Sequence, residues 1–229
     1  MTTTPRIIFH VGGPSFHPVE PQAKRIIAWL GDGHDCGVHD GVDAFDGLDD
    51  CDLLVLMGLH WSGLSTATDG ELAYRPMSDR HKKSFERYVA SGRPILAHHG
   101  SIASYDDWPR FGDLVGFAWV WGSTSHSPIE LHRIQVLETG HPVVAGVRDY
   151  ALVDELYYKI KITDGFEPEI HAVAQWDDVA QPMVMTGYGG RAVGAGKVAY
   201  LANGHDLRAF ECSQMRQLWL NAVEWLLRD

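Results

Sequence analysis

The stretch Pro94-Ile95-Leu96-Ala97-His98-His99-Gly100-Ser101 decides the fold class of this chain. Its first four residues form a short apolar run, which is typical of a buried strand in a parallel sheet. The run stops at two histidines and a glycine, and the loop after it carries hydroxyl, carboxylate and indole groups. Ligands of open parallel sheets bind at the carboxyl ends of the strands. We therefore expect a site at this turn.

The turn also resembles the sharp strand-to-helix connection on which hydrolases and amidotransferases carry a Ser or Cys nucleophile. No cysteine stands at this turn, and Ser101 lies past it, outside any G-x-S-x-G pattern. A Ser101-His-Asp hydrolase is an alternative that the sequence disfavours. The sequence thus predicts a known architecture without its usual thiol chemistry.

The segments before this stretch alternate between strand and helix patterns. The run at residues 52–57 is nearly continuous in apolar residues, as expected of a central strand that is covered on both faces. Apolar residues that recur on one face predict two helices, and Ser78 is a suitable N-cap for the second. This order favours a mostly parallel, helix-flanked sheet. The strands are residues 6–11, 34–39, 52–57 and 94–97, and the helices are residues 23–30 and the segment between Ser78 and Gly92.

The second half of the chain predicts a β-rich extension and not a separate domain. Its candidate strands alternate in hydrophobicity, and two of them flank a glycine-rich connection that favours a hairpin. The final helix keeps one apolar stripe from Met215 to Leu226. The length fits one α/β domain over residues 1–229. The expected strands are residues 129–137, 156–162, 171–176, 182–186 and 197–201, with a short helix at residues 108–114.

Composition excludes several classes of function. The chain has 19 Lys and Arg against 30 Asp and Glu, a formal net charge of −11, so we expect neither nucleic acid nor an anionic membrane as a partner. No secretory signal and no apolar segment of about 18 residues is visible. Three cysteines, far apart in the sequence, form no disulfide framework or CxxC site. A cytoplasmic protein is the expectation.

Histidines follow most of the predicted strands. The chain has 13 of them, and the carboxyl ends of parallel strands share one edge, so those in the loops there are expected to meet. His98 and His99 are adjacent and point in different directions, so only one of them is expected to face the crevice. The histidines at strand ends are His17, His60, His98, His99 and His205.

Carboxylates and tryptophans accompany these histidines. Asp106 and Asp107 could accept hydrogen bonds from sugar hydroxyls, or could cap the helix that begins near Trp108. The pair Asp154-Glu155, placed before a predicted strand, is a second source of acid–base groups. Four tryptophans in or near these loops, Trp61, Trp108, Trp119 and Trp121, could offer an apolar face to a sugar ring, although tryptophan also serves as a core residue.

Metal and nucleotide sites have weaker sequence support. Zinc needs about three nitrogen or oxygen ligands, but no HExxH or similar spaced pair is present. Gly12-Gly13 follows the first strand without a GxGxxG or Walker pattern, so nucleotide binding is rejected. The sequence identifies no cofactor and leaves the metal question open.

Several short motifs occur in one order along nearly the whole chain. They are Tyr105-Asp106-Asp107-Trp108, Phe111-Gly112-Asp113-Leu114-Val115-Gly116, Gly140-His141-Pro142, Asp154-Glu155-Leu156-Tyr157, Gly196-Lys197-Val198-Ala199-Tyr200, Asn203-Gly204-His205-Asp206 and Leu220-Asn221-Ala222-Val223-Glu224-Trp225. This ordered set resembles the trehalose-utilisation, ThuA-like family. Many members of that family carry Gly-x-His-x-Ala at the turn, where this chain reads His98-His99-Gly100.

The resemblance implies a fold like that of class I glutamine amidotransferases, a flavodoxin-like three-layer α/β sandwich with a β extension. It also implies a role in bacterial metabolism of disaccharides or keto-sugars, without Cys-dependent amidotransferase activity. We expect a crevice that binds and transforms a small sugar, in a protein that could form a homo-oligomer. The expected catalytic residues are His99, His98 and His205, and the expected substrate-binding residues are His17, Ser101, Asp106, Trp108 and Glu155.

Two other functions fit the same resemblance. A non-catalytic sugar-binding or regulatory module could use the same scaffold, because fold alone does not determine function. A metal-dependent hydrolase would instead use the histidines at the strand ends as ligands. The sequence leaves open whether the protein is an enzyme.

Overall fold

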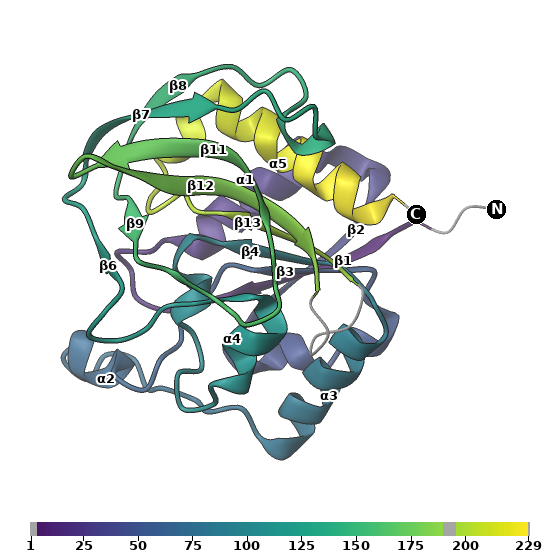
Figure 1. Cartoon of the computed structure of the whole chain (residues 1–229). Helices are drawn as coiled ribbons and strands as arrows, with labels where there is room; N and C mark the ends of the chain where they lie inside the picture. Colours follow the sequence, from purple (N-terminus) through teal and green to yellow (C-terminus); the bar gives the residue numbers. More distant parts are fainter. Residues whose placement is uncertain (1–3, 190–195, 229) are drawn as a thin grey trace.

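The computed structural model describes residues 4–189 and 196–228. Within them, nine strands form one sheet in the order β2-β1-β3-β4-β13-β12-β11-β7-β8 (Figure 1). The first five strands of this order pair in parallel, and the remaining pairings are antiparallel. The parallel strands are β1 (Arg6–Val11), β2 (Asp35–Asp40), β3 (Leu53–Leu56), β4 (Ile95–His98) and β13 (Lys197–Leu201).

The parallel half has flavodoxin-like strand order, with β1 between β2 and β3. Its inner strands β3 and β4 are buried along their whole length, because helices cover both faces. Helices α1 and α5 lie together on one face, and α3 and α4 lie on the other (Figure 1). The predicted α/β sandwich is therefore confirmed. The helices are α1 (Val19–Leu30), α2 (Leu64–Ala67), α3 (Asp79–Ala90), α4 (Arg110–Val115) and α5 (Ser213–Leu227).

The β extension continues the sheet from β13. Its strands are β7 (Glu130–Val136), β8 (Tyr150–Asp154), β11 (Glu169–Trp176) and β12 (Val179–Tyr188). β12 and β13 pair antiparallel, as the hairpin pattern predicts, while part of their glycine-rich connection, residues 190–195, lies outside the described residues. Four two-residue strands form two small separate sheets: β5 (Phe117–Ala118) with β10 (Lys161–Ile162), and β6 (Ser125–His126) with β9 (Tyr157–Tyr158).

The predicted strand at residues 156–162 is wrong. The long strand of this region is β8, which ends at Asp154, and the segment after it makes only the short β9 and β10. Lys159 adopts a left-handed backbone conformation (φ 56°), which a continuous strand does not allow. Asp154-Glu155 thus ends a strand of the large sheet, so Glu155 lies in a loop that can approach the histidines.

The starts of helices α3 and α4 can be compared with the positions predicted from the sequence. Ser78 caps α3: its side chain accepts a hydrogen bond from His81 N (3.3 Å), and the His81 side chain accepts one from Ser78 N. The short helix α4 starts after Pro109, two residues later than predicted. No helix among the described residues is long and apolar enough to span a membrane.

Candidate active site at the carboxyl edge of the sheet

Four buried side chains meet beyond the carboxyl ends of the parallel strands. His17 lies in the loop after β1, His99 in the turn after β4 and His205 in the loop after β13, while Glu155 directly follows β8. Glu155 Oε1 lies 3.2 Å from His205 Nδ1, 3.3 Å from His99 Nε2 and 3.9 Å from His17 Nε2. We call these four residues the His–Glu cluster.

The turn after β4 directs His99 into the cluster. His98 is extended, whereas His99 has a positive φ of 42°, so the chain reverses between the two histidines. The ring of His99 stacks on Tyr157 with centroids 4.2 Å apart, and its Nδ1–H donates to Ala202 O at 2.7 Å. That hydrogen bond fixes the ring with Nε2 facing Glu155.

The ring of His17 packs closely against the backbone of Gly100 where it enters the cluster. A Cβ at position 100 would lie 2.9 Å from His17 Cε1 and 3.0 Å from His17 Nδ1, closer than such contacts allow. Glycine is therefore required here by the close approach of an imidazole ring. The His17 ring centroid lies 4.6 Å from that of His205 and 4.9 Å from that of His99.

Asp154 holds the loop that carries His205. Its buried carboxylate accepts hydrogen bonds from Asn203 Nδ2 (3.1 Å), Gly204 N (2.8 Å) and His205 N (2.9 Å). Gly204 has a φ of 128°, a conformation that favours glycine. Asp154 therefore fixes the backbone of His205, while its neighbour Glu155 faces the His205 ring.

Burial and charge set the ionisation of the cluster. Burial raises the pKa of Glu155, but the contacts with His205 and His99 outweigh it and hold that pKa far below its usual range. Burial lowers the pKa of His17, and the neighbouring histidines His99 and His205 lower it further. The site therefore holds a carboxylate beside a neutral His17 imidazole.

A cavity of about 410 Å³ opens onto the cluster. This volume falls within the range of about 300–1,000 Å³ that is usual for small-molecule sites. Its walls are mainly apolar and aromatic, and its polar groups gather at the cluster and at His126. The lining residues are Phe16, His17, Leu59, Trp61, Ala103, Trp119, Trp121, His126, Ile129, Glu155, Tyr157 and His205.

Several residues expected in the site lie elsewhere, which corrects their predicted roles. His98 points to the opposite side, where its Nε2–H donates to Asn203 O (3.0 Å) and its ring packs on Trp219. Ser101 is buried, and its Oγ accepts a hydrogen bond from His98 N (3.1 Å), so it stabilises the turn. His60 donates to Val11 O (2.9 Å) and is not part of the His–Glu cluster.

Asp106 and Trp108 also serve the scaffold. Asp106 accepts hydrogen bonds from the backbone and side chain of Ser62 (2.7 and 2.8 Å), which ties two loops together. Trp108 packs against the core, with Lys82 Nζ 5.7 Å from its ring centroid. Neither residue lines the cavity. Their contacts in the structure are with other parts of the scaffold, and their role in binding a substrate stays a prediction.

Three further residues complete the site, and one of them, His126, is not indicated by the sequence. Tyr157 supports the His99 ring, and His126 Nδ1 lies 3.0 Å from Glu155 Oε2. Trp119 packs edge-on against Tyr157 at 4.9 Å between centroids, and its indole N–H is buried without a hydrogen-bond partner. Of the four tryptophans in or near the loops, Trp61, Trp119 and Trp121 line the cavity and Trp108 does not, while no sequence pattern indicated His126.

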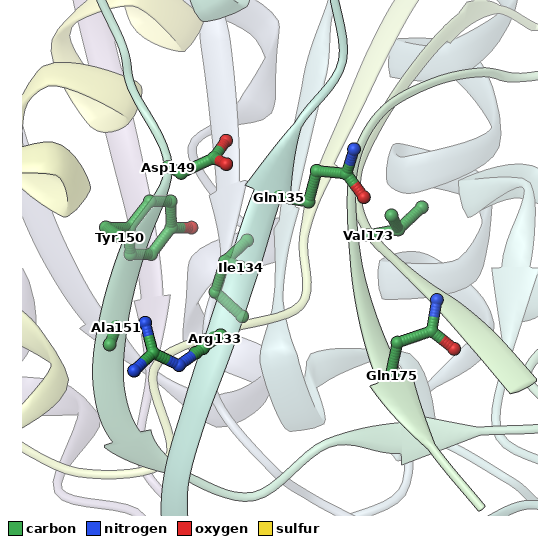
Figure 2. Close-up of a pocket in the computed structure, with 8 residues that line it drawn as sticks. All are labelled: Arg133, Ile134, Gln135, Asp149, Tyr150, Ala151, Val173 and Gln175. Carbon is green, nitrogen blue, oxygen red and sulfur yellow. The ribbon is translucent and has the colours of Figure 1, made fainter. Parts of the chain in front are cut away.

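One other pocket and one other group of titratable side chains differ from this site. A pocket of about 450 Å³ lies on strands β7, β8 and β11 and is lined by exposed Arg133, Gln135 and Gln175 (Figure 2). It contains no histidine and no buried charge. A second titratable group, His141, Glu169 and His171, lies beside β12. Buried His60 lines a pocket of only about 70 Å³, whereas the His–Glu cluster brings several buried titratable side chains to a cavity of about 410 Å³.

Fold and site together define a flavodoxin-like α/β protein with a histidine-rich site at the turn after β4. The sequence model of the ThuA family, described as trehalose utilisation, matches residues 16–226, so the chain belongs to that family. No curated protein matches the chain.

Three solved structures illustrate the likeness. A ThuA-like protein from Parabacteroides merdae is 17% identical, covering 98% of this chain and 90% of its own, with a TM-score of 0.76. A cytoplasmic protein from Salmonella typhimurium is 12% identical (96% and 99% covered, TM-score 0.63). A β-galactosidase from Bacillus circulans is also 12% identical (98% and 31% covered, TM-score 0.58). At these identities the likeness concerns the fold.

Proposed function

We propose that this protein binds a small carbohydrate, a disaccharide or keto-sugar, in the cavity and transforms it by proton transfer at the His–Glu cluster. The family description, trehalose utilisation, supports a sugar as the ligand. The observation that carries the proposal is the meeting of three histidines and a glutamate at one end of an aromatic cavity. We also propose a cytoplasmic location, as in the similar Salmonella protein.

The cavity has apolar aromatic walls and a polar end at the His–Glu cluster, and a sugar likewise has an apolar C–H face and polar oxygens. The apolar C–H face of a sugar ring packs on aromatic side chains such as Trp119 and Tyr157. Hydroxyl or carbonyl oxygens would then point to the cluster, where the polar groups lie. A cavity with few other polar groups gives such a ligand one favoured orientation.

Histidine suits the chemistry because its ordinary pKa lies near neutrality. In this assignment His205 is the general base: its Nδ1 faces Glu155 and its ring lines the cavity, which leaves Nε2 to accept the proton. Glu155 remains ionised and stabilises the imidazolium that forms when His205 accepts a proton. His99, fixed by Ala202, orients the Glu155 carboxylate from the other side.

Carbon NMR of a panel of disaccharides, trehalose among them, and keto-sugars tests the proposal. We expect His205→Ala to abolish turnover with a nearly unchanged thermal midpoint, whereas His39→Ala on the edge strand β2 should behave as wild type. A large loss of stability in His205→Ala would mark that residue as structural. A sugar that stabilises the protein against heat but is recovered unchanged would indicate the sugar-binding module instead.

A further inference from the structure

We propose that His17, His99, His205 and Glu155 bind one divalent transition-metal ion, zinc being the ion that best suits this ligand set. Imidazole nitrogens and a carboxylate oxygen are the ligands that zinc takes in proteins. Each of the four side chains offers one ligand atom, and these atoms all lie within 4.8 Å of one another. All four side chains are buried.

The spacing of the ligand atoms matches a tetrahedral site. Bonds of about 2.1 Å to a central ion place tetrahedral ligands about 3.4 Å apart. Glu155 Oε1 lies 3.2 Å from His205 Nδ1, 3.3 Å from His99 Nε2 and 3.9 Å from His17 Nε2. The remaining separations between the ligand atoms are within 4.8 Å, against about 3.4 Å in a tetrahedral site.

Two buried nitrogens in the cluster contact the Glu155 carboxylate at 3.3 and 3.2 Å without the geometry of a well-aligned hydrogen bond. They are His99 Nε2 and His205 Nδ1, and both face Glu155 Oε1. Buried polar atoms in native structures are nearly always paired, so two such atoms aimed at one point require an explanation. A cation between them and the carboxylate supplies it.

The surroundings of His99 are those of a metal ligand. Its Nδ1–H donates to Ala202 O at 2.7 Å, which leaves the Nε2 lone pair directed into the cluster. Metal-ligating histidines almost always donate their other ring N–H to a carbonyl or carboxylate in this way. Asp154 holds the loop of His205 by accepting hydrogen bonds from the Asn203 side chain and from the backbone N–H groups of Gly204 and His205.

The group at His141, Glu169 and His171 provides an internal contrast. Both ring nitrogens of His171 are hydrogen-bonded to threonine hydroxyls, Thr139 at 2.8 Å and Thr186 at 2.7 Å. His141 Nδ1 accepts a hydrogen bond from Val143 N at 3.1 Å. These nitrogens already have partners, so this group is not expected to bind the ion and serves as the control.

The inference rests on the cavity and cluster of the proposed function, but not on the substrate being a sugar. An ion held by His205 and Glu155 would replace His205 as the group that activates the substrate, because a metal-bound imidazole does not accept the proton. Zinc expands from four to five ligands during catalysis, so the ion could take one substrate oxygen from the cavity. There it would polarise a carbonyl or lower the pKa of a bound hydroxyl.

Isothermal titration with zinc chloride, in the absence of any sugar, tests the inference on full-length protein prepared without a histidine tag and stripped by chelator. We expect one ion per chain, and a Kd at least tenfold weaker in Glu155→Gln. His141→Asn should bind zinc like the wild type. Equal affinity in wild type and Glu155→Gln, or loss of binding in His141→Asn, would overturn the inference.

Imidazole nitrogen NMR of the wild-type protein tests the same point without a variant that could fail to fold. Zinc should shift three histidine rings at one equivalent of ion. Unchanged spectra would instead support a protonated His99 that forms a metal-free ion pair with Glu155. Because neither measurement contains a sugar, failure of metal binding is distinguishable from failure of the proposed carbohydrate activity.

Discussion

Adjacent residues in this site have different roles because a strand ends between them, so that the first belongs to the strand and the second to the following loop or turn. His98 and His99 diverge at the end of β4: the first packs on Trp219 and the second enters the cluster. Asp154 and Glu155 diverge in the same way at the end of β8. In each pair one residue builds the scaffold and the other faces the ligand cavity.

Gly100→Ala tests the packing of His17. The added methyl group would lie 2.9 Å from the imidazole and displace it from the cluster. We expect zinc affinity to fall at least tenfold and stability to fall by about 1–2 kcal/mol, as is usual for overpacking. Gly33→Ala is the matched control, because nothing lies within 4 Å of a Cβ there. Unchanged zinc affinity in Gly100→Ala would contradict this role of glycine.

Asp154→Asn tests the support of the His205 loop. The carboxylate accepts three hydrogen bonds, two of them from the backbone of Gly204 and His205. In asparagine an NH2 group replaces one of the two carboxylate oxygens, and this group cannot accept hydrogen bonds from the N–H donors that face it. We therefore expect a loss of about 2 kcal/mol in the free energy of unfolding. Urea denaturation measures it. A stability equal to wild type would show that the loop does not rely on this charge.

At this scale the sequence predicted His17, His99, His205 and Glu155 as site residues, because strand order alone brings most loop histidines to one edge. It did not indicate the scaffold contacts of Asp106 and Trp108, whose partners, Ser62 and Lys82, come from loops and helices with no sequence pattern linking them. Side-chain direction after a turn depends on backbone angles that the sequence does not reveal.

The helices and strands follow local rules closely in the first half of the chain. Apolar runs and caps predicted β1, β3, β4, α3 and α5 to within a few residues. The extension was harder, because β8 has no continuous apolar run and its register depends on pairing with β7. Non-local pairing of this kind is set by the partner strand, which explains the missed element.

Ser78→Ala tests the predicted cap of α3. Loss of the side-chain acceptor for His81 N should lower the free energy of unfolding by about 1 kcal/mol. Thermal denaturation compared with Thr66→Ala, an exposed threonine in α2, isolates the effect. A midpoint equal to that of the control would mean that the capping box contributes nothing.

For the molecule as a whole, buried histidines make stability depend on pH. Burial lowers the pKa of His171 to about 4, and His141 beside it adds to the effect. Below pH about 6.5, the ordinary pKa of histidine, the unfolded chain binds a proton at His171 that the folded chain does not bind. Stability should therefore fall as the pH drops from about 6.5 to about 4, by up to about 3 kcal/mol from this residue.

The check is urea denaturation of wild type and His171→Gln between pH 7.5 and pH 4.5. The variant should be less stable at pH 7.5, because it loses threonine contacts, but should show a shallower decline with acid. Parallel pH profiles would show that His171 titrates normally in the folded protein.

The whole chain also corresponds to a part of larger enzymes. It matches 31% of the Bacillus circulans β-galactosidase at a TM-score of 0.58, so the same fold occurs inside a longer chain. The sequence allowed the fold to be predicted at this scale because the ordered motifs run through nearly the entire length. The chemistry of the cavity could not be predicted likewise, since it depends on loops from four separate strands.

The most direct test is X-ray diffraction from crystals soaked in zinc chloride and trehalose, with anomalous data collected at the zinc absorption edge. The account predicts one strong anomalous peak bounded by His17, His99, His205 and Glu155, with sugar density against Trp119 and Tyr157. A zinc peak only at His141 and His171, together with sugar bound outside the cavity or not at all, would contradict it.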